Sequence, residues 1–158
     1  MHKKEINLAL IAARKGSKGV KNKNLFKIKN KSITRLAFEV AIKVNNIDSI
    51  VLSSDSQVIL DSVPNNKRLI KLKRKKKLAR DKTPMMPVMQ DAVQQFEKLS
   101  KFKYLVKNLV IIDPTSPLRN HSDVNRALAL FKKKQPDLLV SANQARHYHY
   151  FILLEHKG

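Results

Sequence analysis

The stretch INLALIAARKGSKGVKNKN, residues 6–24, joins a short apolar run to a basic loop. The apolar part, Ile6–Ile11, is typical of a buried strand, and the loop after it contains Gly16 and Gly19, two of the three glycines in the chain. Glycine lets a backbone turn sharply and approach a ligand closely. Free backbone N–H groups beside cations suit a polyphosphate. Positive charge at the same place comes from residues that include Arg14, Lys18, Lys21 and Lys23.

Apolar periodicity in the rest of the chain alternates between strands and helices. The strands are continuous apolar runs, which favours burial on both faces and hence a parallel sheet. Strands that alternate with helices predict an α/β domain with a mainly parallel sheet and right-handed crossovers. The expected strands are 6–11, 47–55, 68–72, 108–112, 138–141 and 148–154, and the expected helices are 32–44, 55–61, 83–99 and 122–134.

The helix expected over 83–99 begins at Thr83-Pro84, by the preference for a polar N-cap and a first-turn proline. Pro87 leaves open a later start. Its expected core face is Met89, Ala92, Val93, Phe96 and Leu99.

Ligands of parallel α/β sheets bind outside the carboxyl ends of the strands. Polar clusters follow expected strands at 14–24, 53–56 and 113–119. We therefore expect these clusters to form one site. Taken alone, Asp113 could hold a metal or orient a hydroxyl, although an aspartate after a strand is more often a turn or capping residue.

Length and composition are those of one globular domain. The chain has 158 residues, of which 42% are hydrophobic, and no cysteine, so disulfides and thiolate metal sites are excluded. There is no apolar run long enough to span a membrane and no secretory leader, so we expect a cytoplasmic protein without a membrane partner.

The formal net charge of +21 attracts polyanions of any kind. The densest basic run, 67–77, is interpreted as a solvated surface, because it lacks the aromatic side chains on which single-stranded nucleic acids stack. Nucleic-acid binding, expected to be non-specific, remains an alternative.

Several other motifs carry little weight. The opening loop matches neither a Walker A motif nor a dinucleotide fingerprint. His147 and His149 have metal-ligand spacing without a third nearby ligand, so an exposed pair is favoured. Ser17 has no identifiable base partner and is not interpreted as a nucleophile. Asp81 and Lys82 are interpreted as capping or surface residues.

Together, the polar clusters resemble four motifs of one enzyme family, in the right order over about residues 6–155. P-T-S-P-L-R is present as Pro114–Arg119, Ser53–Asp55 is similar to the end of the second strand, and Leu78–Pro84 resembles an L-A-x-D-x-T region. The pattern A-R-x-x-S-K-G-x-x-x-K-N is matched by Ala13, Arg14, Ser17, Lys18, Gly19, Lys23 and Asn24. The chain thus resembles the acylneuraminate cytidylyltransferases, and most of all the branch that activates legionaminic or related nine-carbon acids.

The resemblance implies a three-layer Rossmann-like nucleotidyltransferase domain that transfers CMP from CTP to a nonulosonic acid and releases pyrophosphate. It implies that Mg²⁺ shields the phosphates, with no metal ligand identified. Asn24 would contact ribose or phosphate, and Arg74 would lie on the cytosine side. Asp113 and Ser116 would face the reacting centre. The triphosphate would be held by Arg14, Ser17, Lys18 and Lys23, in a loop that includes Ala13 and Gly19; of these, Arg14 and Lys23 also count as catalytic.

The same resemblance implies a nucleotide-binding domain over 1–143 and, over 144–158, the start of a truncated arm for dimerisation and sugar binding. A homodimer is expected for a full-length relative. Met85 and Met86 depart from the family, where small hydroxyl residues help to read the base. A non-catalytic remnant of the family is the second alternative.

Overall fold

The computed structural model of the chain describes residues 3–16 and 19–142, and within them a four-stranded sheet forms the centre of the fold. Its order is β5-β4-β1-β6, and every neighbouring pair is parallel. The strands are β1 (Lys4–Ala12), β4 (Ser49–Ser54), β5 (Leu69–Lys73) and β6 (Tyr104–Ile111). The predicted α/β class and the predominantly parallel sheet are confirmed.

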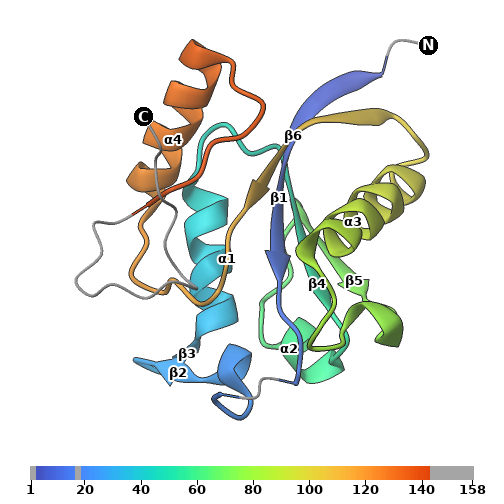
Figure 1. Cartoon of the computed structure of the whole chain (residues 1–158), viewed down its shortest axis with the longest axis vertical. Coiled ribbons are helices and arrows are strands. Elements are labelled where there is room, and N and C mark those ends of the chain that lie inside the picture. The colour runs from blue at the N-terminus through green and yellow to red at the C-terminus, as the bar shows by residue number, and fades with distance from the viewer. Residues whose placement is uncertain (1–2, 17–18, 143–158) are drawn as a thin grey trace.

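Helices cover both faces of this sheet, as Figure 1 shows. α1 (Ile33–Lys43) and α4 (His121–Lys134) lie on one face, and α3 (Met85–Leu99) lies on the other. The short α2 (Gln57–Asp61) lies near the carboxyl ends of the strands. The chain therefore folds as three layers, with the sheet between two helical layers.

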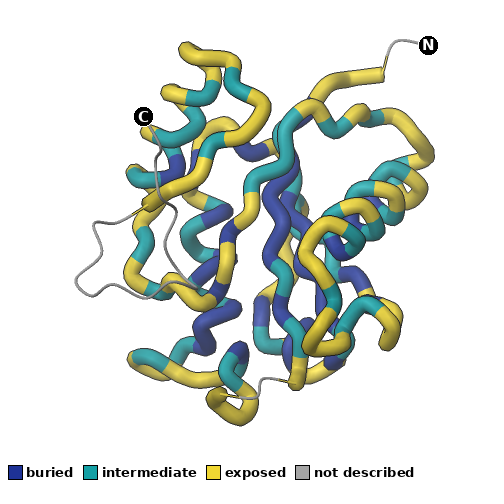
Figure 2. The backbone as a smooth tube through the Cα atoms, viewed as in Figure 1, coloured by how far each residue is buried: buried dark blue, intermediate teal, exposed yellow. Residues whose placement is uncertain are grey.

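Strand β1 divides its side chains between two cores. Leu8 and Leu10 belong to the cluster that contains Phe96 of α3, whereas Ala9 and Ile11 pack in the cluster that contains Phe38 of α1. All four β1 side chains are completely buried, and Figure 2 shows the same strand dark along its middle. This two-sided burial explains why the strand is a continuous apolar run rather than an alternating one.

Local sequence accounts for the limits of α1. Its apolar positions recur at helical spacing, and Ile33, Ala37 and Ala41 face the core. Ser32 caps the first turn, because its hydroxyl accepts a hydrogen bond from the backbone N–H of Arg35 at 3.1 Å. The helix predicted over 32–44 is confirmed.

The third helix begins later than the N-cap pattern predicts. Pro84 is the N-cap residue and Met85 the first helical residue, while the Thr83 hydroxyl donates to the carbonyl of Lys77 at 3.2 Å instead of capping. Pro87 lies in the first turn, where no intrahelical partner exists for its missing N–H, so it does not delay the helix. Leu99 was wrongly placed in the core, since its side chain is 61% exposed.

Other expectations fail for physical reasons. Residues 138–141 form no strand, and Leu138 and Val140 are exposed, so this apolar run lacks a partner within the described residues. The basic run 67–77 is not a uniformly solvated surface, because it contributes β5 and the buried Arg74. The strand predicted over 148–154 and the segment 144–158 lie outside the described residues.

A small hairpin was not predicted. β2 (Lys27–Ile28) and β3 (Lys31–Ser32) pair antiparallel after a short 3-10 helix, η1 (Lys23–Leu25). Lys29 and Asn30 turn the hairpin with positive φ angles of 47° and 64°. A second 3-10 turn, η2 (Lys76–Leu78), follows β5.

Among the described residues, no helix combines the length and the apolar character needed to cross a membrane.

Candidate active site

A pocket of about 570 Å³ opens where three strands of the sheet end. Ala12 closes β1, Arg74 follows β5, and Asp113 follows β6 by two residues. This position is the one that parallel α/β sheets use for ligands. The lining is formed by Ala12, Arg14, Gly19, Val20, Lys23, Asn24, Arg74, Leu78, Arg80, Asp81, Thr83, Met85, Val88, Asp113 and Thr115.

The lining is strongly cationic. Four basic side chains meet two carboxylates there, so the pocket favours an anionic ligand. The basic residues come from two loops, one after β1 (Arg14, Lys23) and one after β5 (Arg74, Arg80).

Arg14 joins these two loops. Its Nη1 forms an ion pair with Oδ1 of Asp81, and about a third of each side chain is exposed. Asp81 is exposed, as expected for a surface residue, but it also lines the pocket and contacts the first basic residue of the opening loop, which its interpretation as a capping or surface residue did not include.

The loop after β1 is anchored by polar contacts with its neighbours. The backbone N–H of Lys15 donates to Oδ1 of Asp55 at 2.8 Å, and Nδ2 of Asn24 donates to the carbonyl of Arg14 at 2.8 Å. The hydroxyl of Thr34, at the start of α1, donates to the carbonyl of Asn24 at 2.7 Å. Asn24 is buried, so it supports the loop as well as lining the pocket.

Neither glycine of this loop requires a left-handed backbone, since no described glycine has a positive φ. A Cβ at Gly19 would meet no atom within 4 Å. The free space there is compatible with close approach of a ligand rather than with tight internal packing.

Arg74 is a buried cation, with 6% of its surface exposed. Its Nη2 donates to the carbonyl of Ser53 at 2.8 Å and its Nε to the Ser53 hydroxyl at 3.1 Å. Burial lowers the pKa of Arg74, and the negative charges of Asp55 and Asp91 oppose that shift. These contacts hold the guanidinium rigidly at the pocket wall, between the ends of β4 and β5.

The turn after β6 is organised by Asp113. Its Oδ1 accepts hydrogen bonds from both the backbone N–H and the hydroxyl of Thr115, each at 2.8 Å. This Asx-type turn brings Asp113 and Thr115 to the pocket. Ser116 is exposed on the same turn and is not among the lining residues.

The other residues predicted for the site differ in whether they line the pocket. Gly19 and Lys23 line the pocket. Ala13 is fully buried behind it, where its N–H donates to the carbonyl of Ser53 at 3.0 Å. Ser17 and Lys18, like His147 and His149, lie outside the described residues.

Sequence reasoning missed several lining residues on the loop after β5, namely Arg80, Asp81 and Thr83, and Thr115 on the turn after β6. A signal was available, because the L-A-x-D-x-T region and the P-T-S-P-L-R motif contain all four residues. No residue-level pattern, however, indicated that the loop after β5 folds back against Arg14.

Among the described residues, no group of three or more histidine or acidic side chains forms a candidate metal centre. The pocket does offer Asp113, which makes no ion pair with any described residue.

Comparison with known proteins identifies the family of this pocket. The family described as Cytidylyltransferase matches residues 8–151. The chain belongs to the cytidylyltransferase family. This cytidylyltransferase chain is 36% identical over 148 residues to the Post-translational flagellin modification protein B of Campylobacter coli. It is 35% identical over 148 residues to the CMP-N,N'-diacetyllegionaminic acid synthase of Campylobacter jejuni. Each match covers 94% of this chain and 62% of the relative, so the chain spans less than two thirds of their length.

Solved structures agree with the fold of this cytidylyltransferase chain. A CMP:2-keto-3-deoxy-manno-octonic acid synthetase, complexed with CTP, superimposes with a TM-score of 0.59 at 16% identity. The match covers 82% of this chain and 48% of that one. At this identity the likeness concerns the fold, and it confirms the Rossmann-like nucleotidyltransferase architecture.

Proposed function

We propose that the pocket binds CTP and that the chain takes part in transfer of CMP to a nonulosonic acid of the sialic or legionaminic type, with release of pyrophosphate. The observation that carries the proposal is the cationic pocket at the strand ends, lined by the family's motif residues. The names of its relatives support the reaction class, since one is a CMP-N,N'-diacetyllegionaminic acid synthase.

The opening loop is suited to the triphosphate. Arg14 and Lys23 supply charge at the end of β1, and Gly19 leaves open space beside them. We assign Ser17 and Lys18 to the same group on sequence grounds. Phosphoryl transfer depends mainly on positioning and charge neutralisation, which these side chains would provide.

The opposite wall is suited to the nucleoside. Arg74 is fixed by Ser53, and the apolar side chains of Leu78, Met85 and Val88, which follow Arg74 in the chain, also line the pocket. A rigid guanidinium beside apolar surface can hydrogen-bond a base edge while the ring packs on carbon atoms. We place cytosine there, with Asn24 near the ribose or the phosphates.

The reaction forms a bond between the anomeric oxygen of the acid sugar and the α-phosphorus, while the bond from that phosphorus to the bridging oxygen of pyrophosphate breaks. The hydroxyl proton must leave as the new bond forms. Asp113 is the lining carboxylate that makes no ion pair with a described residue, so we propose that it orients this hydroxyl and accepts its proton. Ser116 lies three residues further along, exposed and outside the lining, so we assign it no contact with the reacting groups.

The donor set fits a Mg²⁺ ion carried by the nucleotide rather than a metal centre built by the protein. Mg²⁺ in nucleotide sites is held by one or two carboxylates together with phosphate oxygens. Asp113 would supply the protein ligand, and the bound ion would screen the phosphate charges.

We also propose a cytoplasmic location, where CTP is available, and a homodimeric assembly in which residues 144–158 contribute to the dimer and sugar contacts. Both are expectations from the family resemblance. Analytical ultracentrifugation at several concentrations tests the assembly.

The reaction itself is tested by incubating the chain with CTP, Mg²⁺ and either N-acetylneuraminic or N,N'-diacetyllegionaminic acid. Mass spectrometry should detect a CMP-sugar in amounts equal to the pyrophosphate released, and Arg14→Ala should abolish both. Binding of CTP without any CMP-sugar would favour the non-catalytic remnant, and no binding of CTP would contradict the proposal.

A further inference from the structure

Three arginines line the pocket, and their guanidinium groups differ in what they contact. Arg14 is paired with Asp81, and Arg74 is bonded to Ser53. Arg80 is exposed, and its side chain makes no hydrogen bond or ion pair with any residue that the structure describes. It is therefore the pocket arginine none of whose side-chain donors is engaged by a described residue.

The backbone holds Arg80 in a defined place. It follows η2, and its carbonyl accepts a hydrogen bond from the N–H of Thr83 at 3.1 Å, which closes a tight turn. The next residue, Asp81, reaches across the pocket to Arg14. Arg80 is thus attached to the point where the loop after β5 meets the phosphate-binding loop after β1.

Charge favours an anion at this point. Asp81 already neutralises Arg14, whereas Arg80 has no such counter-charge among the described residues. A guanidinium presents its donors in a planar fork that matches two oxygens of a phosphate group. The position is the variable x of the L-A-x-D-x-T pattern, so the family resemblance assigns it no role.

We infer that Arg80 binds the β- and γ-phosphates of the nucleotide, and hence the pyrophosphate that leaves. The inference rests on the proposed function and adds to it a binding residue outside the motif positions. It places Arg80 with Arg14 among the residues that contact the phosphates, next in the chain to the Asp81 that pairs with Arg14.

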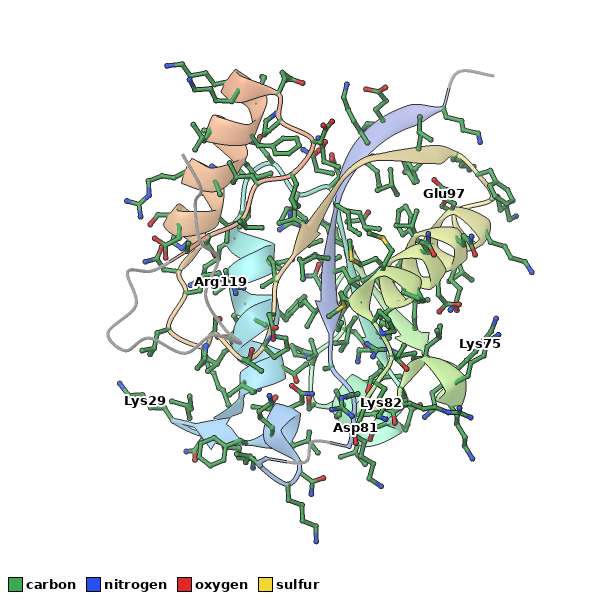
Figure 3. The ribbon with its side chains drawn as sticks, in the orientation of Figure 1. Lys29, Lys75, Asp81, Lys82, Glu97 and Arg119 are labelled. Atoms are coloured by element: carbon green, nitrogen blue, oxygen red, sulfur yellow. The ribbon has the colours of Figure 1, made fainter. Side chains whose placement is uncertain are left out.

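Lys82 supplies a matched control. It is exposed, lies two residues from Arg80 and is not among the lining residues. Figure 3 places Asp81 and Lys82 together at the end of the molecule toward which β1 runs, with Glu97 at the other end. Lys82→Gln and Arg80→Gln remove the same charge from the same loop, and they differ in whether the residue lines the pocket.

The experiment measures the dissociation constants of CTP, CMP and inorganic pyrophosphate by calorimetry for the full chain and three variants. Arg80→Gln should raise the dissociation constants of CTP and pyrophosphate about tenfold, as expected for loss of a charge-assisted contact. It should raise that of CMP less than twofold. Arg80→Lys should recover part of the loss, because it keeps the charge but not the fork. Lys82→Gln should change all three constants less than twofold.

Two results would overturn the inference while leaving the proposed function intact. If Arg80→Gln and Lys82→Gln weakened the binding of CTP and pyrophosphate equally, the effect would come only from long-range charge. If Arg80→Gln weakened the binding of CMP as strongly as that of CTP, Arg80 would lie at the nucleoside. If the unaltered chain bound neither CTP nor pyrophosphate, both the proposed function and the role of Arg80 would be contradicted. Unchanged melting temperatures of the variants would confirm that they fold.

Discussion

Arg14 and Asp81 form an ion pair across the mouth of the pocket, between the loop that follows β1 and the loop that follows β5. The two residues are 67 positions apart in the chain. A carboxylate that holds a phosphate-binding arginine occupies the same donors that a phosphate would use. Ligand binding must therefore displace Asp81 or share Arg14 with it.

Replacing Asp81 tests this competition. Asp81→Asn keeps the shape of the side chain but removes its charge, so the dissociation constant for inorganic pyrophosphate should fall several-fold in calorimetry. Asp91→Asn is the control, because Asp91 pairs with Lys75 at 3.9 Å and does not line the pocket. Weaker binding by Asp81→Asn would show instead that the ion pair positions Arg14 for the phosphate.

Arg74 should contribute to stability as well as to binding. Arg74→Ala leaves the Ser53 hydroxyl without its buried partner and removes one of the two hydrogen bonds that the Ser53 carbonyl accepts, which costs about 1–3 kcal/mol. Urea denaturation should show this loss in the free energy of unfolding. Arg80→Ala, which removes an exposed side chain that makes no hydrogen bond or ion pair with a described residue, should change the same quantity by less than about 0.5 kcal/mol. Equal losses in the free energy of unfolding for Arg74→Ala and Arg80→Ala would contradict the structural role of Arg74.

The contacts of Glu39 with Lys31 and Arg35 lead us to expect that stability depends on pH in a specific way. Hydrogen bonds from Lys31 and Arg35 lower the pKa of Glu39 below its ordinary value of 4.5, despite partial burial. A carboxyl whose folded-state pKa is depressed stabilises the fold above its unfolded pKa and loses that contribution as pH falls through the folded value. Glu39→Gln should therefore cost about 0.5 kcal/mol at pH 7, and the difference should shrink below pH 4.5. A difference that grew with acidity would contradict the pairing.

The carboxyl end of α4 offers a stabilising substitution. Gln135 caps this helix in the left-handed region, with φ 49° and ψ 44°. Gln135→Gly should raise the free energy of unfolding by about 0.5 kcal/mol, because glycine adopts this backbone without steric cost. Ser100, the cap of α3, has a φ of −78°, so Ser100→Gly should be destabilising. Thermal unfolding measures the melting temperatures of the two variants. Shifts of the same sign in both variants would contradict this expectation.

Much of the fold could be predicted because its strongest signals are periodic. Strand β1 is an uninterrupted apolar run that is buried on both faces, and α1 repeats its apolar residues at helical spacing above a serine cap. The predictions failed where periodicity carries no information. The β2–β3 hairpin has two-residue strands and a Lys29-Asn30 turn, and residues 138–141 are apolar without a described partner.

The site was predicted in part for a similar reason. Arg14, Asn24 and Asp113 follow strand ends, and parallel strands bring their carboxyl ends together. Asp81 and Arg80 were not predicted to line the site, because they belong to an irregular loop whose path depends on contacts rather than on a repeating pattern. Ser116 was expected at the reacting centre, whereas the Asx turn brings Thr115 to the lining instead.

We propose above that this pocket is a CTP site built around Arg14. The most direct test of this proposal is calorimetric titration of the chain and of Arg14→Ala with CTP and ATP in the presence of Mg²⁺. We expect the unaltered chain to bind CTP at least tenfold more tightly than ATP, and Arg14→Ala to lose most of the CTP affinity. Equal affinity for the two nucleotides, or undiminished CTP binding by Arg14→Ala, would contradict the proposal.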